Sequence, residues 1–230
     1  MILQLKDLEE CQQANVQCNK PTPVLLRNER LIQLGPLDVC HELFLMNITA
    51  ISATYIDSLL PMKHYADVKS DLYFWCKILE NDIHFNQSKN EYGDTWTLNE
   101  KIVIRIRSSL KVFKEYLQLK PFLLVYLKYK EEILGQSEVN LQPLIPTDNV
   151  EDFLKITENN SSILNQRCYL SKTDFIENNI ERRNPYFDLQ LKLQYIGKTH
   201  ITSSNAIISD LITPNTMELK NILKQVISFV

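Results

Sequence analysis

Five basic side chains between residues 101 and 114 are the clearest group in this sequence that could do chemistry. Lys101, Arg105 and Arg107 share one parity of an alternating run, and Lys111 and Lys114 follow three residues apart. Residues two apart point to the same side of a strand, and residues three apart share one face of a helix. The five cations are therefore expected to form one basic surface that attracts an anionic partner.

The net charge of the residues around this surface does not identify the partner that it binds. Residues 101–130 contain eight basic residues and one acidic residue, a net charge of +7, although the whole chain carries −3. Three interpretations fit: a solvated face, a face for an acidic protein surface such as tubulin, or a face for anionic lipid headgroups. Nucleic acid is disfavoured, because the strand lacks exposed aromatic side chains interleaved with the basic ones, on which single-stranded bases stack.

The motifs of common catalytic and cofactor sites do not occur in this sequence. It has four glycines, no Gly-rich phosphate loop and no Gly-x-Ser-x-Gly nucleophile motif. Four histidines, His41, His64, His84 and His200, are scattered without metal-binding spacing. We expect a protein that is not an enzyme and has no metal or cofactor.

The cysteines and the apolar segments indicate a reducing compartment. The five cysteines, at positions 11, 18, 40, 76 and 168, include no Cys-x-x-Cys pair and are expected to be free thiols. The first residues lack a signal-peptide pattern, and the sequence has no apolar run of about 18 residues, the length of a membrane-spanning helix. A cytoplasmic location is expected.

Alternation of apolar and polar residues predicts the elements that must position the basic side chains. Period-two runs predict strands at residues 44–50, 70–78, 101–107 and 122–130, one centred on Val139, and a particularly regular one at 187–195. Such half-apolar strands are typical of an antiparallel sheet with one buried face. Between the third and fourth strands, Ser108 or Ser109 is expected to cap a helix that ends before Pro121.

The remaining segments suggest three parts of the chain. Residues 1–41 are expected to be a lead-in or linker, with the end of a preceding domain, residues 42–197 the folded domain, and residues 198–230 a linker with an amphipathic helix. Within the domain, residues 146–184 are rich in Asn, Asp and Glu. We interpret them as a surface loop with one strand at Arg167–Leu170.

Residues 122–141 resemble the corresponding segment of C2 domains, which implies a C2-type β-sandwich. Together with the helices predicted above, the expected fold is an all-β, antiparallel C2-type sandwich with one inserted helix and a C-terminal helix. Calcium-binding C2 domains carry paired aspartates where this chain has Lys128 and Lys130, and Asp67 and Asp71 match their first calcium loop. A hard cation needs oxygen ligands, and ammonium groups repel it. The four residues are thus expected to form a degenerate, calcium-independent site.

A narrower resemblance is carried by residues 32–36, 44–50, 59–61, 103–110 and 134–141, the Arg-Ile-Arg-Ser-Ser run being the most specific. These segments resemble the second C2 domain of the centrosomal protein of 120 kDa family. The resemblance implies a location in the cytoskeleton, at the centrosome or centriole. It further implies a scaffold acting in centriole assembly, centriole elongation and cilium biogenesis, with centriolar proteins, tubulin or microtubules as partners.

Two function hypotheses follow from the basic surface and the resemblance. The first is a non-enzymatic interaction module of a centriolar scaffold, binding proteins without calcium. The alternative is a calcium-independent C2 domain that binds anionic membrane lipids through the basic strand at residues 101–107.

Overall fold

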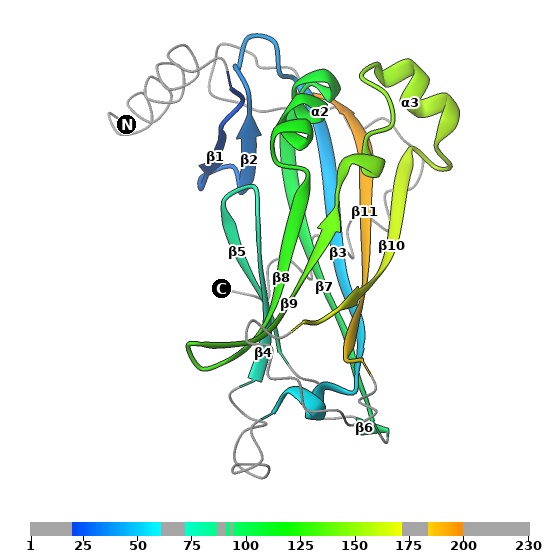
Figure 1. The fold of residues 1–230 in the computed structure, drawn as a ribbon. Coiled ribbons are helices and arrows are strands. Elements are labelled where there is room, and N and C mark those ends of the chain that lie inside the picture. The colour runs from blue at the N-terminus through cyan, green and yellow to red at the C-terminus, as the bar shows by residue number, and fades with distance from the viewer. Residues whose placement is uncertain (1–19, 61–71, 87–90, 93, 172–183, 200–230) are drawn as a thin grey trace.

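The computed structural model describes residues 20–60, 72–86, 91–92, 94–171 and 184–199. Within these ranges two β-sheets lie face to face, and a helix crosses one end of them (Figure 1). This arrangement confirms the expected all-β sandwich with one inserted helix. The amphipathic helix expected after residue 198 and the strand-like start of the chain lie outside the described residues.

The larger sheet has the strand order β1-β2-β7-β3-β11-β10. Its strands are β1 Pro23–Leu26, β2 Leu31–Leu34, β3 Glu42–Thr54, β7 Thr95–Ser108, β10 Ser161–Tyr169 and β11 Tyr186–Lys198, with the short β6 Glu91–Tyr92 paired to β7. Neighbours are antiparallel, as expected, except that β2 and β7 run parallel, with Ile32 beside Ile106. Alternation reports which face is buried and not the strand direction, so it could not predict this pairing.

The smaller sheet has the strand order β5-β4-β8-β9, and all its pairs are antiparallel. Its strands are β4 Leu72–Ile78, β5 Asn81–Asn86, β8 Phe122–Tyr129 and β9 Glu132–Asn140. Four of the predicted strands thus become β3, β4, β8 and β9. The two that remain, at residues 101–107 and 187–195, lie within β7 and β11.

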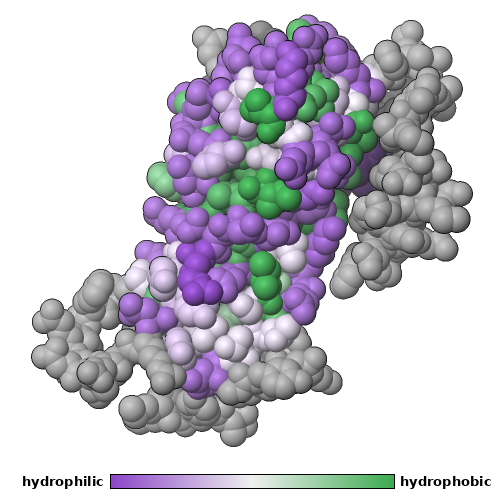
Figure 2. Space-filling view, turned by 90° about the vertical axis from the view of Figure 1, so that its right-hand side faces the viewer, coloured by the Kyte–Doolittle hydropathy of each residue, from purple (hydrophilic) through white to green (hydrophobic). Residues whose placement is uncertain are grey.

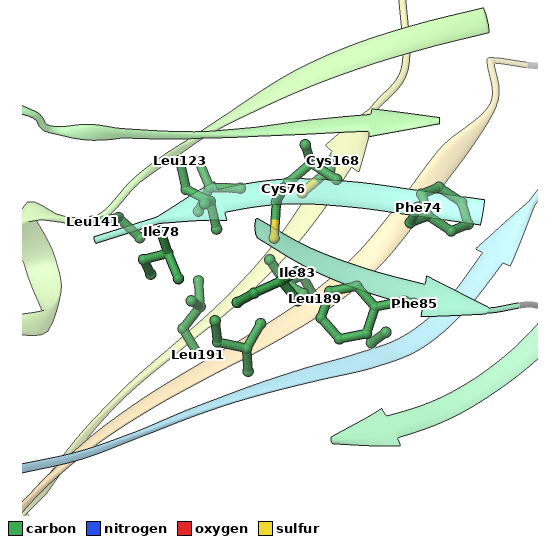
Figure 3. Packing of buried hydrophobic residues seen from close by; sticks show 14 of the residues in the cluster. Phe74, Cys76, Ile78, Ile83, Phe85, Leu123, Leu141, Cys168, Leu189 and Leu191 are labelled. Carbon is green, nitrogen blue, oxygen red and sulfur yellow. The ribbon is translucent and has the colours of Figure 1, made fainter. Parts of the chain in front are cut away.

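The core lies between the inward faces of the two sheets. Phe187 of β11 stacks on Phe74 of β4 with ring centroids 4.3 Å apart. Figure 3 shows how apolar residues of the smaller sheet, such as Ile78 and Leu123, lie opposite Leu189 and Leu191 of β11. Burial of this apolar surface is the main stabilising contribution to the fold.

Helices and turns close the sandwich at its ends. They are α2 Leu110–Leu119, α3 Val150–Ile156 and the short 3-10 segments η1 Ile56–Leu59 and η3 Gln142–Leu144. Ser109 caps α2 by accepting a hydrogen bond from the backbone N–H of Val112, which confirms one of the two expected caps. Phe113 of α2 is fully buried and contacts Phe44 edge to face. No helix among the described residues is long and apolar enough to cross a membrane.

The surface loop expected at residues 146–184 is wrong for most of the part that the structure describes, although the strand expected at Arg167–Leu170 overlaps the end of β10. This part contains α3 and the nine-residue strand β10, which pairs along its length with β11. β10 is an edge strand, so its outward positions are polar or exposed, and only the end of its sequence shows a clear apolar signal. Residues 172–183 lie outside the described residues.

The segment expected to lead into the domain contributes two strands to it. β2 pairs with β7, β1 pairs with β2, and Leu34 is completely buried. The hydroxyl of Ser108 donates to the backbone carbonyl of Leu34 at 2.8 Å, which joins the end of β7 to the end of β2. Residues 23–34 therefore extend the larger sheet, while the expected domain limits at residues 42 and 197 stay a prediction.

Candidate functional site

The expected basic surface is present only in part. β7 places Ile102, Ile104 and Ile106 on the inward face, opposite Ile48, Met46 and Phe44 of β3. The other face of β7 carries Lys101, which is exposed, and Arg105, which is half-buried. On α2, Lys111 is exposed, whereas the ammonium of Lys114 donates to the carbonyl of Pro146 at 3.3 Å.

Arg107 is not part of a solvent-facing surface, which corrects the expectation for this residue. Its side chain is only 4% exposed; Nε donates to Oε1 of Gln33 at 2.6 Å, and Nη1 lies 2.9 Å from Oε2 of Glu29. The strand alternation is as predicted, but Glu29 and Gln33 approach Arg107 from a segment more than 70 residues away. A buried guanidinium must be paired in this way, so Arg107 is a structural residue.

The two lysines of the degenerate calcium site lie at the end of β8. The ammonium of Lys128 lies 4.3 Å from the ring centroid of Trp75, and that of Lys130 lies 5.2 Å from the ring of Tyr129. The hydroxyl of Tyr73 donates to the carbonyl of Lys130 at 3.0 Å. Asp67 and Asp71 lie outside the described residues, so the degenerate site expected from the four residues stays a prediction.

A candidate site that the sequence reasoning missed is a groove of about 310 Å³ beside the smaller sheet. The β4–β5 turn, the end of α2 and the start of β8 enclose it. Its outer lining includes Trp75, Lys77, Glu80, Lys120, Phe122 and Leu124, and its inner lining consists of buried core residues such as Met46, Phe113 and Leu141. Below we call it the β4–β8 groove. Figure 2 views the molecule from the right-hand side of Figure 1, near α3 and β10, where hydrophobic side chains also reach the surface between polar ones.

The outward face of β8 gives the β4–β8 groove an apolar wall. Phe122 is 54% exposed and Leu124 is 38% exposed. The next outward residue, Tyr126, lies against Trp75 of β4 with ring centroids 5.0 Å apart. A strand that is apolar on both faces is typical of one covered on both sides. The continuous apolar run at residues 122–127 was the sequence signal that could have revealed this wall.

The rim of the groove carries charge held by a tight turn. Leu79 and Glu80 have positive φ angles of 47° and 61°, as a two-residue hairpin turn requires. The turn brings the carboxylate of Glu80 to both Lys77, at 3.6 Å, and Lys120. The pKa of the Glu80 carboxyl is lowered, chiefly by a hydrogen bond from Lys120. The pKa of Tyr116 is raised to about 12, first by burial and second by the electrostatic effect of Glu80.

Among the described residues, no cluster of three or more His, Cys, Asp or Glu side chains has the arrangement of a metal site. Cys40, Cys76 and Cys168 are free and buried. Burial raises the pKa of Cys76 and of Cys168 to about 12, so both thiols are held in the protonated, unreactive form.

The two sheets and the inserted helix define the class of the protein, an all-β sandwich. The chain belongs to the family described as Cep120 protein, whose model matches residues 20–195. This membership confirms the family that the sequence resembled.

Named relatives agree with the family assignment. The chain is 27% identical over 139 residues to the centrosomal protein of 120 kDa from Xenopus tropicalis, covering 60% of this chain and 16% of the relative. It is 30% identical over 121 residues to the protein of the same name from Homo sapiens, covering 52% and 12%. The names place the chain among centrosomal proteins, as expected. The matched part of the chain spans only 16% and 12% of the length of these two relatives.

Solved C2 domains are similar at low identity. A structure of two C2 domains of Extended-Synaptotagmin 2 is 14% identical, with a TM-score of 0.40, covering 70% of this chain and 42% of that one. A C2 domain-containing protein from a putative elicitor-responsive gene is also 14% identical, with a TM-score of 0.36, covering 69% and 92%.

Proposed function

We propose that this chain is a non-enzymatic, calcium-independent interaction module of a centriolar scaffold protein, acting in centriole assembly and elongation and in cilium formation. The observation that carries the proposal is the match of the Cep120 family model to residues 20–195, which span both sheets. The relatives are named as centrosomal proteins. The partners are centriolar proteins or tubulin.

Calcium independence is supported by the side chains at the end of β8. By the sequence resemblance, Lys128 and Lys130 stand where calcium-binding C2 domains carry carboxylates, and the ammonium groups of both lie over aromatic rings. A cation of charge +2 is repelled by ammonium groups and needs about six to eight oxygen ligands. Partner binding at this end of the sandwich is therefore proposed to proceed without metal.

Attraction of an acidic partner is proposed to come from Lys101, Arg105 and Lys111. These residues keep exposed or half-exposed side chains, whereas Arg107 is engaged with Glu29. Salt screens the attraction between exposed charges, and the screening length is about 8 Å at physiological ionic strength. Association should therefore be fast at low salt and weaken as salt is added.

The test combines recruitment and pelleting. A fluorescent fusion of the full 230-residue chain is expressed in ciliated cells, and its signal is compared with a centriole marker. Purified chain is then pelleted with microtubules and, separately, with phosphatidylserine vesicles, each at low and high salt. Recruitment together with salt-sensitive microtubule pelleting supports the proposal. Vesicle pelleting without recruitment or microtubule pelleting would favour the lipid-binding alternative instead.

Two variants test whether the basic surface is responsible for the binding. Arg105→Glu reverses a half-exposed charge, while Lys155→Glu reverses an exposed charge on α3 at a distant part of the chain. Both should fold like the wild type, since surface substitutions usually change stability by less than about 0.5 kcal/mol. Only Arg105→Glu should weaken pelleting. Equal loss in both variants would indicate nonspecific attraction.

A further inference from the structure

The geometry points to the β4–β8 groove as a docking site for a short segment of a partner protein that presents an apolar side chain next to a carboxylate. The inference rests on the proposed function as an interaction module and assigns its surface and the chemistry of its partner. The apolar side chain contacts Phe122, Leu124 and the ring of Trp75. The carboxylate lies at the rim formed by Lys77 and Lys120.

Large apolar side chains at the mouth of the groove are exposed: Phe122 is 54% exposed and Leu124 is 38% exposed. Trp75 and Tyr126 lie beside them in the lining, with ring centroids 5.0 Å apart. The buried side chains of Phe113 and Leu141 belong to the inner lining. Aromatic side chains beside a pocket are the usual anchors of protein–protein interfaces. A groove of about 310 Å³ lies at the small end of binding pockets, so it suits one or two inserted side chains.

The lining at the rim of the groove carries more positive than negative side chains. The groove lining contains two ammonium groups, those of Lys77 and Lys120, and one carboxylate, that of Glu80. One positive charge is therefore left over in the lining. Asp82 and Glu138, on β5 and β9, flank Lys77 and Leu124 in the strand register but are not part of the lining. They would direct an incoming carboxylate toward the Lys120 end.

The tight β4–β5 turn holds the rim of the groove in a fixed position. Positive φ angles at Leu79 and Glu80 are unfavourable for residues other than Gly, Asn and Asp. The amide of Asn81 donates to the carbonyl of Leu79 at 2.6 Å and holds the turn. The two-residue hairpin between β4 and β5 requires these angles at both of its central positions. Here the turn holds Glu80 within reach of both lysines.

Charge distinguishes the partner segment from other occupants. A second copy of the chain would bring the same surplus of positive charge to the rim. The apolar residues of the C-terminal segment 215–230 are accompanied by one Glu and two Lys, so that segment is also net positive. An acidic segment of another protein complements the rim, since opposite charges give specificity and raise the association rate.

The experiment uses the full chain and four synthetic octapeptides. The first is Ser-Gly-Leu-Phe-Glu-Glu-Gly-Ser. The other three replace both Glu by Gln, both Glu by Lys, or Leu-Phe by Ser-Ser. Affinity is measured by fluorescence polarisation of labelled peptide, and Trp75 emission reports the location. Trp96, the other tryptophan, is 2% exposed and should stay constant. We expect the first peptide to bind with a dissociation constant of about 1 mM or below, and each of the others at least about tenfold more weakly.

Variants of the chain test the apolar contacts and the charged contacts of the groove separately. Leu124→Ser should weaken the first peptide about tenfold. The double variant Lys77→Glu and Lys120→Glu should reverse the preference, so that the Lys peptide binds more tightly than the Glu peptide. A merely structural role could not produce this reversal. The matched controls are Ile163→Ser on β10, where Ile163 is 54% exposed, and Lys155→Glu. Both controls should leave binding unchanged, with melting temperatures measured for every variant.

Several outcomes would overturn the inference. One is equal binding of all four peptides, or no binding to a folded chain. Another is Trp75 emission that responds to phosphatidylinositol phosphate vesicles and not to the first peptide. A dimer that Leu124→Ser dissociates would assign the groove to a second copy. Peptide binding that appears only after Leu219→Ser and Ile222→Ser would assign it to the chain's own C-terminal segment. Failed peptide binding with intact centriole recruitment would overturn this site and leave the proposed function standing.

Discussion

The ammonium of Lys128 lies 4.3 Å from the ring centroid of Trp75 across the β4–β8 pair. At this separation the ring face attracts the cation, a contribution of about 0.5–1 kcal/mol where the pair is exposed. The lysine that was expected at a calcium-ligand position therefore contacts a neighbouring aromatic side chain.

Calcium should leave the stability and the heat signal of the chain unchanged. Titration calorimetry with calcium chloride is expected to give only dilution heat, because Lys128 and Lys130 repel the ion. Binding at a hundred times the dissociation constant would stabilise the fold by about 2.7 kcal/mol, which a melting curve detects easily. A saturable isotherm with a raised melting temperature would contradict calcium independence.

Arg107→Ala should be strongly destabilising, whereas Arg105→Ala should not. Removing Arg107 leaves Glu29 without its charged partner and Gln33 without its hydrogen bond, and breaking a buried pair costs about 3–5 kcal/mol. Arg105 is half-buried, with one contact of 3.5 Å to the carbonyl of Glu29, so about 0.5 kcal/mol is expected. Urea unfolding of the two variants measures the difference. Similar midpoints for both would mean that Arg107 is not held as described.

Leu191→Ala should cost about 2–5 kcal/mol, because Leu191 is completely buried between the sheets. Lys192→Ala, one position along β11 and on the outward face, should be close to neutral. Thermal and urea unfolding of the pair tests the burial of one face of β11. Equal losses would contradict it.

Ala50→Pro should also destabilise the fold. Ala50 lies in β3, between β7 and β11, and pairs with Glu100 and Leu189. Proline has no N–H for the ladder and is excluded from central strands. We expect little soluble protein, measured as the folded fraction after purification, and Leu25→Pro in the edge strand β1 serves as the milder control.

Cys76 and Cys168 should resist alkylation until the protein unfolds. Burial raises their pKa from the ordinary 9.0 to about 12, so the folded state holds their protons more tightly than the unfolded state. Their contribution to stability is complete below pH 9 and is lost as the pH rises from about 9 to about 12. Iodoacetamide labelling at about pH 8, just below the ordinary thiol pKa, mapped by mass spectrometry with and without urea, checks this. Equal labelling in both conditions would show that the thiols are accessible.

The elements with strong local signals were predictable. Phe44, Met46 and Ile48 in β3, and Phe187 to Leu193 in β11, alternate without interruption, and the structure buries these apolar residues. Ser109 and Pro121 bracket α2 as capping and helix-stopping residues do. Only the end of β10 was predicted, as the strand at Arg167–Leu170, because an edge strand with Asn165 and Arg167 at outward positions and Gln166 on the inward face has little alternation to detect.

The sequence by itself determined which residues alternate, where the inserted helix begins and ends, and which family the chain resembles. Those properties depend on backbone periodicity and on local side-chain chemistry. Only the tertiary structure decided that Arg107 is buried and that Phe122 and Leu124 line a groove with Lys77 and Lys120. Burial of an outward side chain depends on which distant segment lies over it. The β1–β2 turn covers Arg107, while among the described residues the outward side of Phe122 stays exposed.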